Sequence, residues 1–238
     1  MGSPAACERE PQILALWERG VGLGRWARED SLLVALGPPP SQLGARNAAL
    51  LHLRGRLFDR AWPLCSRCPA CAADYEFVAD CLALADQLSA LAAPPATARI
   101  DHSGRSIELR APIVNDLREI AVLPDAQSAA RALLARCVSD GGTLDELDEQ
   151  AVADLSAHLE GLDPGAVVSF ALHCPHCGHD WSAAIDVGDA LWCELQRAAE
   201  RALIEIDALA RAYGWSEREV LSLSPVRRAA YLQLVGAS

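Results

Sequence analysis

Residues 174–181 read CPHCGHDW, and residues 68–75 read CPACAADY. Both stretches belong to an internal repeat, because CPACAADYEFVAD from residue 68 aligns with CPHCGHDWSAAID from residue 174 without a gap, at an offset of 106. Each copy begins with a Cys-Pro-x-Cys turn and continues into a segment whose pattern is typical of a strand. The repeat therefore indicates a duplicated element, a cysteine knuckle followed by a strand.

The chemistry of the cysteines explains why the two copies should meet. Zinc prefers soft or borderline ligands in a tetrahedron, and four cysteine thiolates are a standard structural set. One C-x-x-C turn supplies two thiolates, so two turns complete the shell. We therefore predict a structural zinc site formed by Cys68, Cys71, Cys174 and Cys177. A closed shell of four thiolates leaves no open coordination position for hydrolysis.

Other roles for the cysteines stay open. Cys65 forms a further C-x-x-C with Cys68, so a redox dithiol is one alternative, and knuckles that have lost their metal are another. Cys65 or one of the histidines His173, His176 and His179 could also replace a ligand, although exposed polar residues are the simpler interpretation of the histidines. Four further cysteines stand alone and are expected to be small buried hydrophobic residues: Cys7, Cys81, Cys137 and Cys193.

Motifs of common enzymes are absent from the sequence, which has no Gly-rich phosphate loop, no G-x-S-x-G and no H-E-x-x-H. Asp74 and Asp180 occupy equivalent positions of the repeat. Carboxylates can serve catalysis, but this equivalence favours a shared structural role, such as capping a knuckle or orienting the end of a strand. We therefore expect a protein that is not an enzyme.

The fold class predicted from the sequence is α+β and predominantly helical, with two C-x-x-C zinc knuckles, each followed by a short strand, that form a small sheet or zinc ribbon. Two short helical patterns fall within residues 11–36, further helical periodicity covers residues 41–60, 81–92, 114–121, 125–138 and 189–213, and strand patterns cover 75–80, 105–111, 166–173 and 181–187. Thr143 and Glu146 predict a capping box at the start of another helix. We divide the chain into an N-terminal helical region (1–62), a zinc-knuckle α+β region with inserted helices (63–187) and a C-terminal helical region (188–238), together forming one compact unit.

The C-terminal region carries clear helix boundaries. The long helix should stop at Gly214, because glycine adopts a left-handed conformation at helix ends. Ser216 and Glu219 predict a capping box. Ser224-Pro225 then starts a final helix. This helix is expected to turn five apolar residues toward a core: Val226, Ala229, Ala230, Leu232 and Val235.

Composition limits the class of protein. The chain has 238 residues and a formal net charge of −11, which argues against a nucleic-acid partner because phosphate binding depends on Lys and Arg. The first residues lack the apolar stretch of a secretory signal. No segment offers the roughly 20 apolar residues that span a bilayer. We therefore predict a cytoplasmic protein without membrane insertion, whose nine cysteines favour metal binding over disulfides.

The C-terminal sequence ARAYGWSEREVLSLSPVRRAAYLQLV, preceded by a knuckle and by DALWCELQRAAERALIEIDAL, resembles the baseplate hub assembly chaperone family of contractile-tailed phages and phage-tail-like injection systems. ALWERGVGLGRWARED, CPAC with DYEFVAD, and IELRAPIVNDLREIA extend the resemblance over most of the chain. The sequence departs from the family at Ile113, where relatives usually have threonine after the proline. The resemblance implies a non-enzymatic assembly factor or minor structural component, with baseplate, hub or spike proteins as partners and a place in the cytoplasm or in the assembled particle.

An alternative function is that of a zinc-ribbon protein that binds nucleic acid or regulates transcription. This hypothesis requires a basic patch near the knuckles, but the sequence offers only Arg67 beside the first knuckle and no Lys or Arg from 173 to 187. For the assembly factor, Trp215 and the pair Arg227 and Arg228 are candidates for a partner surface. A hydrophobic helix corner and solvated arginines are the simpler interpretation of these residues.

Overall fold

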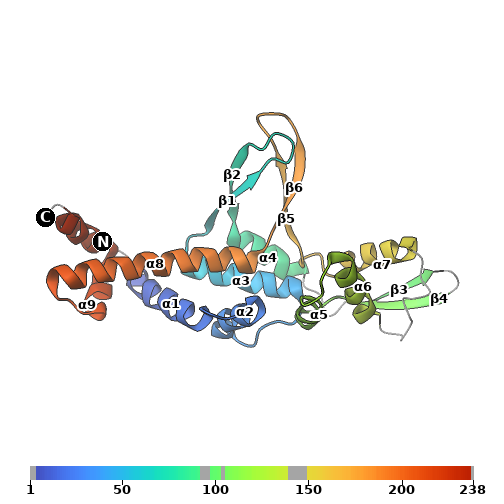
Figure 1. Cartoon of the computed structure of the whole chain (residues 1–238), viewed down its shortest axis with the longest axis horizontal. Helices are drawn as coiled ribbons and strands as arrows, with labels where there is room; N and C mark the ends of the chain where they lie inside the picture. Colours follow the sequence, from blue (N-terminus) through green and yellow to red (C-terminus); the bar gives the residue numbers. More distant parts are fainter. Residues whose placement is uncertain (1–3, 92–96, 103–104, 139–148, 237–238) are drawn as a thin grey trace. The chain divides into compact units, whose positions relative to one another are not determined.

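The computed structural model describes residues 4–91, 97–102, 105–138 and 149–236 (Figure 1). It is mostly helical, with small antiparallel two-stranded sheets, as the sequence predicted. The helices are α1 (Pro4–Gly20), α2 (Arg25–Leu33), the 3-10 helix η1 (Val34–Leu36), α3 (Leu43–Leu57), α4 (Cys81–Leu91), α5 (Val114–Ile120), α6 (Ala126–Cys137), α7 (Glu149–Leu162), α8 (Val187–Tyr213), α9 (Glu217–Ser222) and α10 (Pro225–Gly236). The strands are β1 (Ala61–Arg67), β2 (Asp74–Asp80), β3 (Thr97–His102), β4 (Arg105–Arg110), β5 (Val168–His173) and β6 (Asp180–Ile185).

The chain divides into two compact units, one formed by residues 1–35 with 188–238 and one by residues 36–187. The three regions drawn from the sequence stay a prediction. The capping box expected at Thr143 lies outside the described residues. Within the described part of the chain, no helix is long and apolar enough to span a bilayer.

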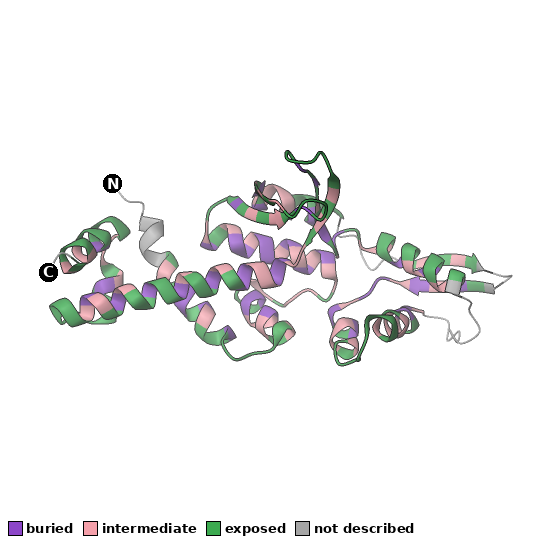
Figure 2. Ribbon diagram, turned by 45° about the horizontal axis from the view of Figure 1, so that its top comes forward, coloured by how far each residue is buried: buried purple, intermediate pink, exposed green. Residues whose placement is uncertain are grey.

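The long helix α8 organises the first unit. Most of its buried residues recur at helical spacing along one side (Figure 2): Leu191, Leu195, Ala199, Ala202, Ile206 and Leu209. Arg28 of α2 forms an ion pair with Asp189 at 2.7 Å and lies over the ring of Trp192. Gly20 is required beside the same ring, since a Cβ there would come within 2.5 Å of the indole. These contacts attach the N-terminal helices to the start of α8.

An aromatic corner ends α8. Gly214 adopts a positive φ of 71°, as predicted for a helix stop. The rings of Tyr213, Trp215 and Tyr231 contact one another, with centroids 4.7 to 5.6 Å apart. Trp215 is partly buried in this cluster, so the simpler interpretation of a hydrophobic helix corner describes it well. The predicted capping box of α9 is confirmed, because Ser216 and Glu219 exchange both bonds.

The final helix, α10, turns a different side inward from the one expected. Arg228 is only 2% exposed and forms ion pairs with Glu10 and, at 2.8 Å, with Glu205. Arg228 therefore belongs to the interior of this unit and is unsuited to a docking surface. Three of the five apolar residues predicted to face a core are instead exposed: Val226, Ala229 and Ala230. The side of α10 that carries Arg228 faces inward because the buried guanidinium is paired there with two partly exposed carboxylates.

In the second unit, α3 packs against α4 and supports two β-hairpins. A Cβ at Gly55 would lie 2.3 Å from Leu82, so glycine permits the close approach of the two helices. At the C-terminal end of α3, buried Arg54 donates to the carbonyls of Asp59 and Ala61, which leads the chain into β1. Because Arg54 also lies over the ring of Trp62, the first hairpin is anchored where α3 ends.

The second hairpin is anchored at the opposite end of α3. Asp163 accepts a hydrogen bond from the backbone of Gly44 at 2.9 Å, and Asn47 donates to the carbonyls of Gly165 and Ala166 at 2.9 and 3.1 Å. These bonds hold the loop that leads into β5. The two hairpins therefore rise from opposite ends of one buried helix.

A separate small core lies in the segment between the hairpins. It is formed by β4, α6 and α7 through Ile107, Leu109, Leu134, Cys137, Leu155 and Leu159, and Ile100 of β3 packs against it. Asp116 of α5 is buried and accepts hydrogen bonds from Arg110 and Arg136 at 2.7 to 3.0 Å, which joins α5 to this core. The strand predicted at residues 105–111 is confirmed as β4, whereas no strand was predicted over residues 97–102, where its partner β3 lies.

Candidate metal centre

Each C-x-x-C turn lies at the tip of an antiparallel hairpin. Hairpin 1 consists of β1 and β2, and hairpin 2 consists of β5 and β6. The structure adds the strand that precedes each turn to the repeat, because β1 and β5 also correspond at the offset of 106. Figure 1 shows the two hairpins side by side with their tips together.

The two tips share one backbone conformation. In hairpin 1 the N–H of Cys68 donates to the carbonyl of Ala73 and the N–H of Ala72 donates to the carbonyl of Cys68, both at 2.9 Å. In hairpin 2 the equivalent residues, Cys174, His179 and Gly178, make the same two bonds at the same distance. Ala72 and Gly178 both have left-handed backbones, with φ of 59° and 73°. The repeat seen in the sequence is therefore a repeat of backbone geometry.

The structure brings the four predicted cysteines together. Sγ of Cys68 lies 3.7 Å from Sγ of Cys177, and Sγ of Cys71 lies 3.6 Å from Sγ of Cys174. All four sulfur atoms lie within 4.8 Å of one another. Sulfur ligands placed about 2.3 Å from a tetrahedral zinc ion would be about 3.8 Å apart. The observed spacing fits that shell and is too long for disulfide bonds, and the four thiols are free.

The two hairpins are related by a local two-fold arrangement. In the repeat, Cys68 is equivalent to Cys174, and Cys71 is equivalent to Cys177. The contact between Cys68 and Cys177 is therefore equivalent to the contact between Cys174 and Cys71. Tyr75 and Trp181 are equivalent residues, and their rings touch edge to face at 5.9 Å between centroids. Mutual contacts of this kind are typical of a two-fold interface. The four sulfur atoms lie at this pseudo-symmetric junction.

Aromatic packing below the tips holds the hairpins against each other. The ring of Phe77 lies 5.2 Å from that of Phe170, and the indole N–H of Trp181 donates to the hydroxyl of Ser66 at 3.4 Å. Tyr75 stacks on Phe77 within hairpin 1. Phe170 and Ser66 were not among the residues predicted for the site, although each stands two residues from a leucine of the same strand, Leu172 and Leu64, and this alternation was the signal available in the sequence.

The sulfur atoms influence one another's ionisation. Burial acts to raise the pKa of Cys174, but backbone N–H groups of Cys177 and His176 and the neighbouring thiols donate to its sulfur and lower the pKa to about 6. For Cys177, the N–H of His179 acts to lower the pKa, but burial and the three nearby sulfurs outweigh it and raise the pKa to about 12. One thiol therefore ionises readily and hinders the ionisation of its neighbour. A cation is needed to hold four thiolates in this space.

Neither Cys65 nor the three histidines join the cluster. Cys65 is exposed on β1, opposite Glu76, and all three histidines are exposed. In the part of the chain that the structure describes, the four cysteines are the one group of at least three His, Cys, Asp or Glu residues close enough to share a metal ion. Of the four isolated cysteines, Cys81 and Cys137 are buried as predicted, Cys193 is exposed on α8 contrary to expectation, and the side chain of Cys7 lies outside the described residues.

Asp74 and Asp180 share a structural role, as their equivalence suggested. Each pairs with the residue directly before the first cysteine of its turn: Asp74 with Arg67 at 3.0 Å and Asp180 with His173 at 2.8 Å. These residues also face each other in the strand register. Each pair closes the end of its hairpin just below the cysteines.

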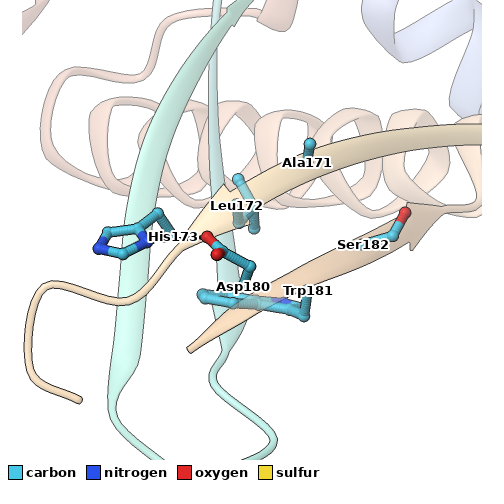
Figure 3. A pocket seen from close by; sticks show the side chains of 6 residues that line it. All are labelled: Ala171, Leu172, His173, Asp180, Trp181 and Ser182. Carbon is cyan, nitrogen blue, oxygen red and sulfur yellow. Dashed lines mark hydrogen bonds and ion pairs between the residues drawn. The ribbon is translucent and has the colours of Figure 1, made fainter. Parts of the chain in front are cut away.

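A shallow depression on hairpin 2 is lined by Ala171, Leu172, His173, Asp180, Trp181 and Ser182. Figure 3 shows the carboxylate of Asp180 turned toward the ring of His173 within it. Its two ionisable groups are thus engaged with each other, and the remaining side chains include none that would complete a catalytic set. The depression is better described as the outer face of a two-stranded sheet than as a binding pocket.

Comparisons of the chain with models of protein families, with curated proteins and with solved structures find no match.

Proposed function

We propose that the four thiolates of Cys68, Cys71, Cys174 and Cys177 hold one structural zinc ion and that the two hairpins together form a zinc ribbon. The observation that carries this proposal is the near-tetrahedral spacing of the four sulfurs. Soft thiolates select zinc or iron over magnesium or calcium. A zinc ion would neutralise thiolate charge and supply no reactive position, since the protein fills all four sites.

The ion would join segments that are distant in sequence. The hairpins are anchored at opposite ends of α3, and the chain between Cys71 and Cys174 contains the separate small core described above. Closing a loop of about 100 residues removes much of the conformational entropy of the unfolded chain. The metal would therefore stabilise the whole second unit, because little of the site exists before folding.

We further propose that the protein is a non-enzymatic assembly chaperone or minor component of the baseplate hub of a contractile tail. Support comes from the family resemblance, whose most specific residues form the aromatic corner of Tyr213, Gly214 and Trp215 and the capping box at Ser216. A closed metal shell also suits a scaffold better than an enzyme. Baseplate, hub or spike proteins would be the partners.

The charge distribution favours this proposal over nucleic-acid binding. The arginine beside the first turn, Arg67, is already paired with Asp74. The second turn has histidines and Asp180 but no Lys or Arg nearby. A ribbon that binds phosphates needs several cations available on one face.

Elemental analysis of the purified, reduced protein tests the metal site. We expect about one zinc ion per chain, as in other closed four-cysteine sites. Cys71→Ser should abolish stoichiometric binding, whereas Cys65→Ser is a matched control in which an exposed cysteine of the same hairpin is removed. Metal-free wild-type protein, or equal metal contents in the two variants, would refute the site.

Co-purification tests the assembly role. The tagged chain would be isolated from cells that produce the complete contractile particle, and bound proteins would be identified by mass spectrometry. We expect hub, spike or baseplate proteins to be enriched over a tagged control chain of similar charge. Enrichment of nucleic acid without tail proteins would contradict the proposal.

A further inference from the structure

We propose that the four thiols also form an oxidised, metal-free state in which the disulfides Cys68–Cys177 and Cys71–Cys174 join the two hairpins. The inference rests on the role proposed above for the four cysteines, which is to join the two hairpins. Its chemistry, however, uses the thiols alone. The two hairpins would thus stay covalently joined when oxidation displaces the metal.

The geometry points to bonds between hairpins. Each sulfur has a sulfur of the other hairpin within 3.7 Å, and the pseudo-two-fold arrangement makes the two contacts equivalent. A disulfide requires the sulfurs to approach about 2.05 Å, so each contact must close by roughly 1.6 Å. The aromatic contacts below the tips, Tyr75–Trp181 and Phe77–Phe170, already hold the strands at this separation and would persist after the metal leaves.

Each of the two short sulfur contacts between the hairpins includes one exposed cysteine that an oxidant can reach. Cys71 and Cys177 are exposed, whereas Cys68 and Cys174 are 1% exposed. Each cross-hairpin pair therefore combines an exposed and a buried cysteine. An exposed thiol that is oxidised next to a second thiol is the arrangement that converts a sulfenic acid into a disulfide before further oxidation.

Hydrogen peroxide is the oxidant that we consider. The exposed thiol loses its proton, its thiolate attacks one peroxide oxygen, the O–O bond breaks, and a sulfenic acid and, once the released hydroxide takes up the proton, water are formed. The buried thiol then attacks the sulfenic sulfur, the S–O bond breaks, and the disulfide and a second water are formed. Each pair thus gives two electrons and two protons to one peroxide. Two peroxide molecules oxidise the cluster, and a divalent ion bound by it is released.

The pairing decides whether the hairpins stay joined. Disulfides inside each turn, Cys68–Cys71 and Cys174–Cys177, would close only short loops and leave the hairpins connected by packing alone. Disulfides between hairpins close loops of about 100 residues, for which the loss of unfolded-state entropy is larger. The oxidised form should therefore unfold at a higher temperature than the reduced, metal-free form.

The experiment uses the full chain, stripped of metal by a chelator and treated with about two equivalents of hydrogen peroxide. Non-reducing digestion and tandem mass spectrometry identify the disulfides, and thermal unfolding is followed with and without reductant. We expect the peptide that begins at Cys68 to be linked to the peptide that contains Cys174 and Cys177. We also expect the melting temperature to fall when reductant is added.

Two double variants provide the matched control, since both lose two ligands. Cys71→Ser/Cys174→Ser keeps the contacting pair Cys68 and Cys177, whereas Cys71→Ser/Cys177→Ser keeps the buried pair Cys68 and Cys174. The first should form its disulfide faster, because its two sulfurs lie 3.7 Å apart and one of them is exposed. Disulfides confined to the separate turns in the wild-type chain, or a melting temperature that reductant does not change, would overturn the inference.

The metal content before oxidation separates this inference from the proposed function. A chain that contains zinc but forms disulfides only within its turns would refute the inference and leave the zinc site standing. A chain that never contains metal but forms both cross-hairpin disulfides would refute the zinc site and support the inference.

Discussion

Hairpin 1 and hairpin 2 have the same backbone at their tips but different side chains around it. Both place two cysteines in a turn closed by the same pair of hydrogen bonds, and both have an aspartate paired with the residue before the turn. Around this frame Ala72 stands where hairpin 2 has Gly178, and Tyr75 where it has Trp181. The two hairpins thus share the turn backbone, the four cysteine positions and the aspartate pairs, and differ in the side chains around them.

The largest expected effect is equal in the two hairpins. Cys71→Ser and Cys177→Ser each remove one exposed cysteine at equivalent positions of the cluster proposed to bind zinc. Because loss of a structural metal removes folding free energy, each variant should lose its metal and more than about 4 kcal/mol of stability. Denaturant unfolding with parallel metal analysis measures both. A variant that keeps its metal would show that the two hairpins do not contribute equally.

The aromatic pair should distinguish the hairpins. Trp181 has the larger ring and also donates to Ser66, whereas Tyr75 packs with its ring alone against Trp181 and Phe77. We expect Trp181→Ala to cost about 3 kcal/mol and Tyr75→Ala about 1.5 kcal/mol, since both side chains are only partly buried. Chemical denaturation of the two variants in parallel gives the difference. An equal or reversed order would mean that hairpin 1 supplies more of the packing than its contacts indicate.

Substitutions at the residue with a left-handed backbone in each tip, Ala72 or Gly178, should change stability less and in opposite directions. A Cβ at Gly178 would meet no atom within 4 Å, so Gly178→Ala should cost only backbone strain, about 1 kcal/mol. Ala72→Gly should relieve the same strain in hairpin 1 and gain a few tenths of a kcal/mol, because the greater freedom of glycine in the unfolded chain offsets part of it. Unfolding midpoints at unchanged metal content test this. Two changes of the same sign would break the equivalence of the turns.

The smallest effect is expected at the ion pairs. Asp74→Asn and Asp180→Asn remove the partners of Arg67 and His173, and exposed pairs contribute little to stability. Both variants should keep their metal and unfold close to the wild type, with the difference reduced further in high salt because salt screens exposed charges. Loss of zinc from either variant would assign the aspartate a direct influence on the thiolates.

Local features of the site and of the C-terminal corner could be read from the sequence. Gly214, the capping box of Ser216 and Glu219, and the two C-x-x-C turns depend on a few neighbouring residues, and the structure has them where they were expected. The side of a helix that faces the core was harder to predict. The residues of α10 show apolar side chains on both sides, so periodicity alone did not reveal that Arg228 is buried while Val226 is 80% exposed.

The sequence by itself indicated the four cysteines of the repeat, because their spacing and the offset of 106 are visible without a fold, but it left Cys65 and the nearby histidines as alternatives, which lie outside the cluster in the structure. Only the tertiary structure decided how they pair: Cys68 lies against Cys177 and Cys71 against Cys174. It also decided that the hairpins stand on opposite ends of α3 and meet through Tyr75 and Trp181. The physical reason is the separation in sequence between the residues that determine each feature. A turn is set by bonds within a few residues, whereas the approach of two turns across about 100 residues depends on packing that accumulates over the whole unit.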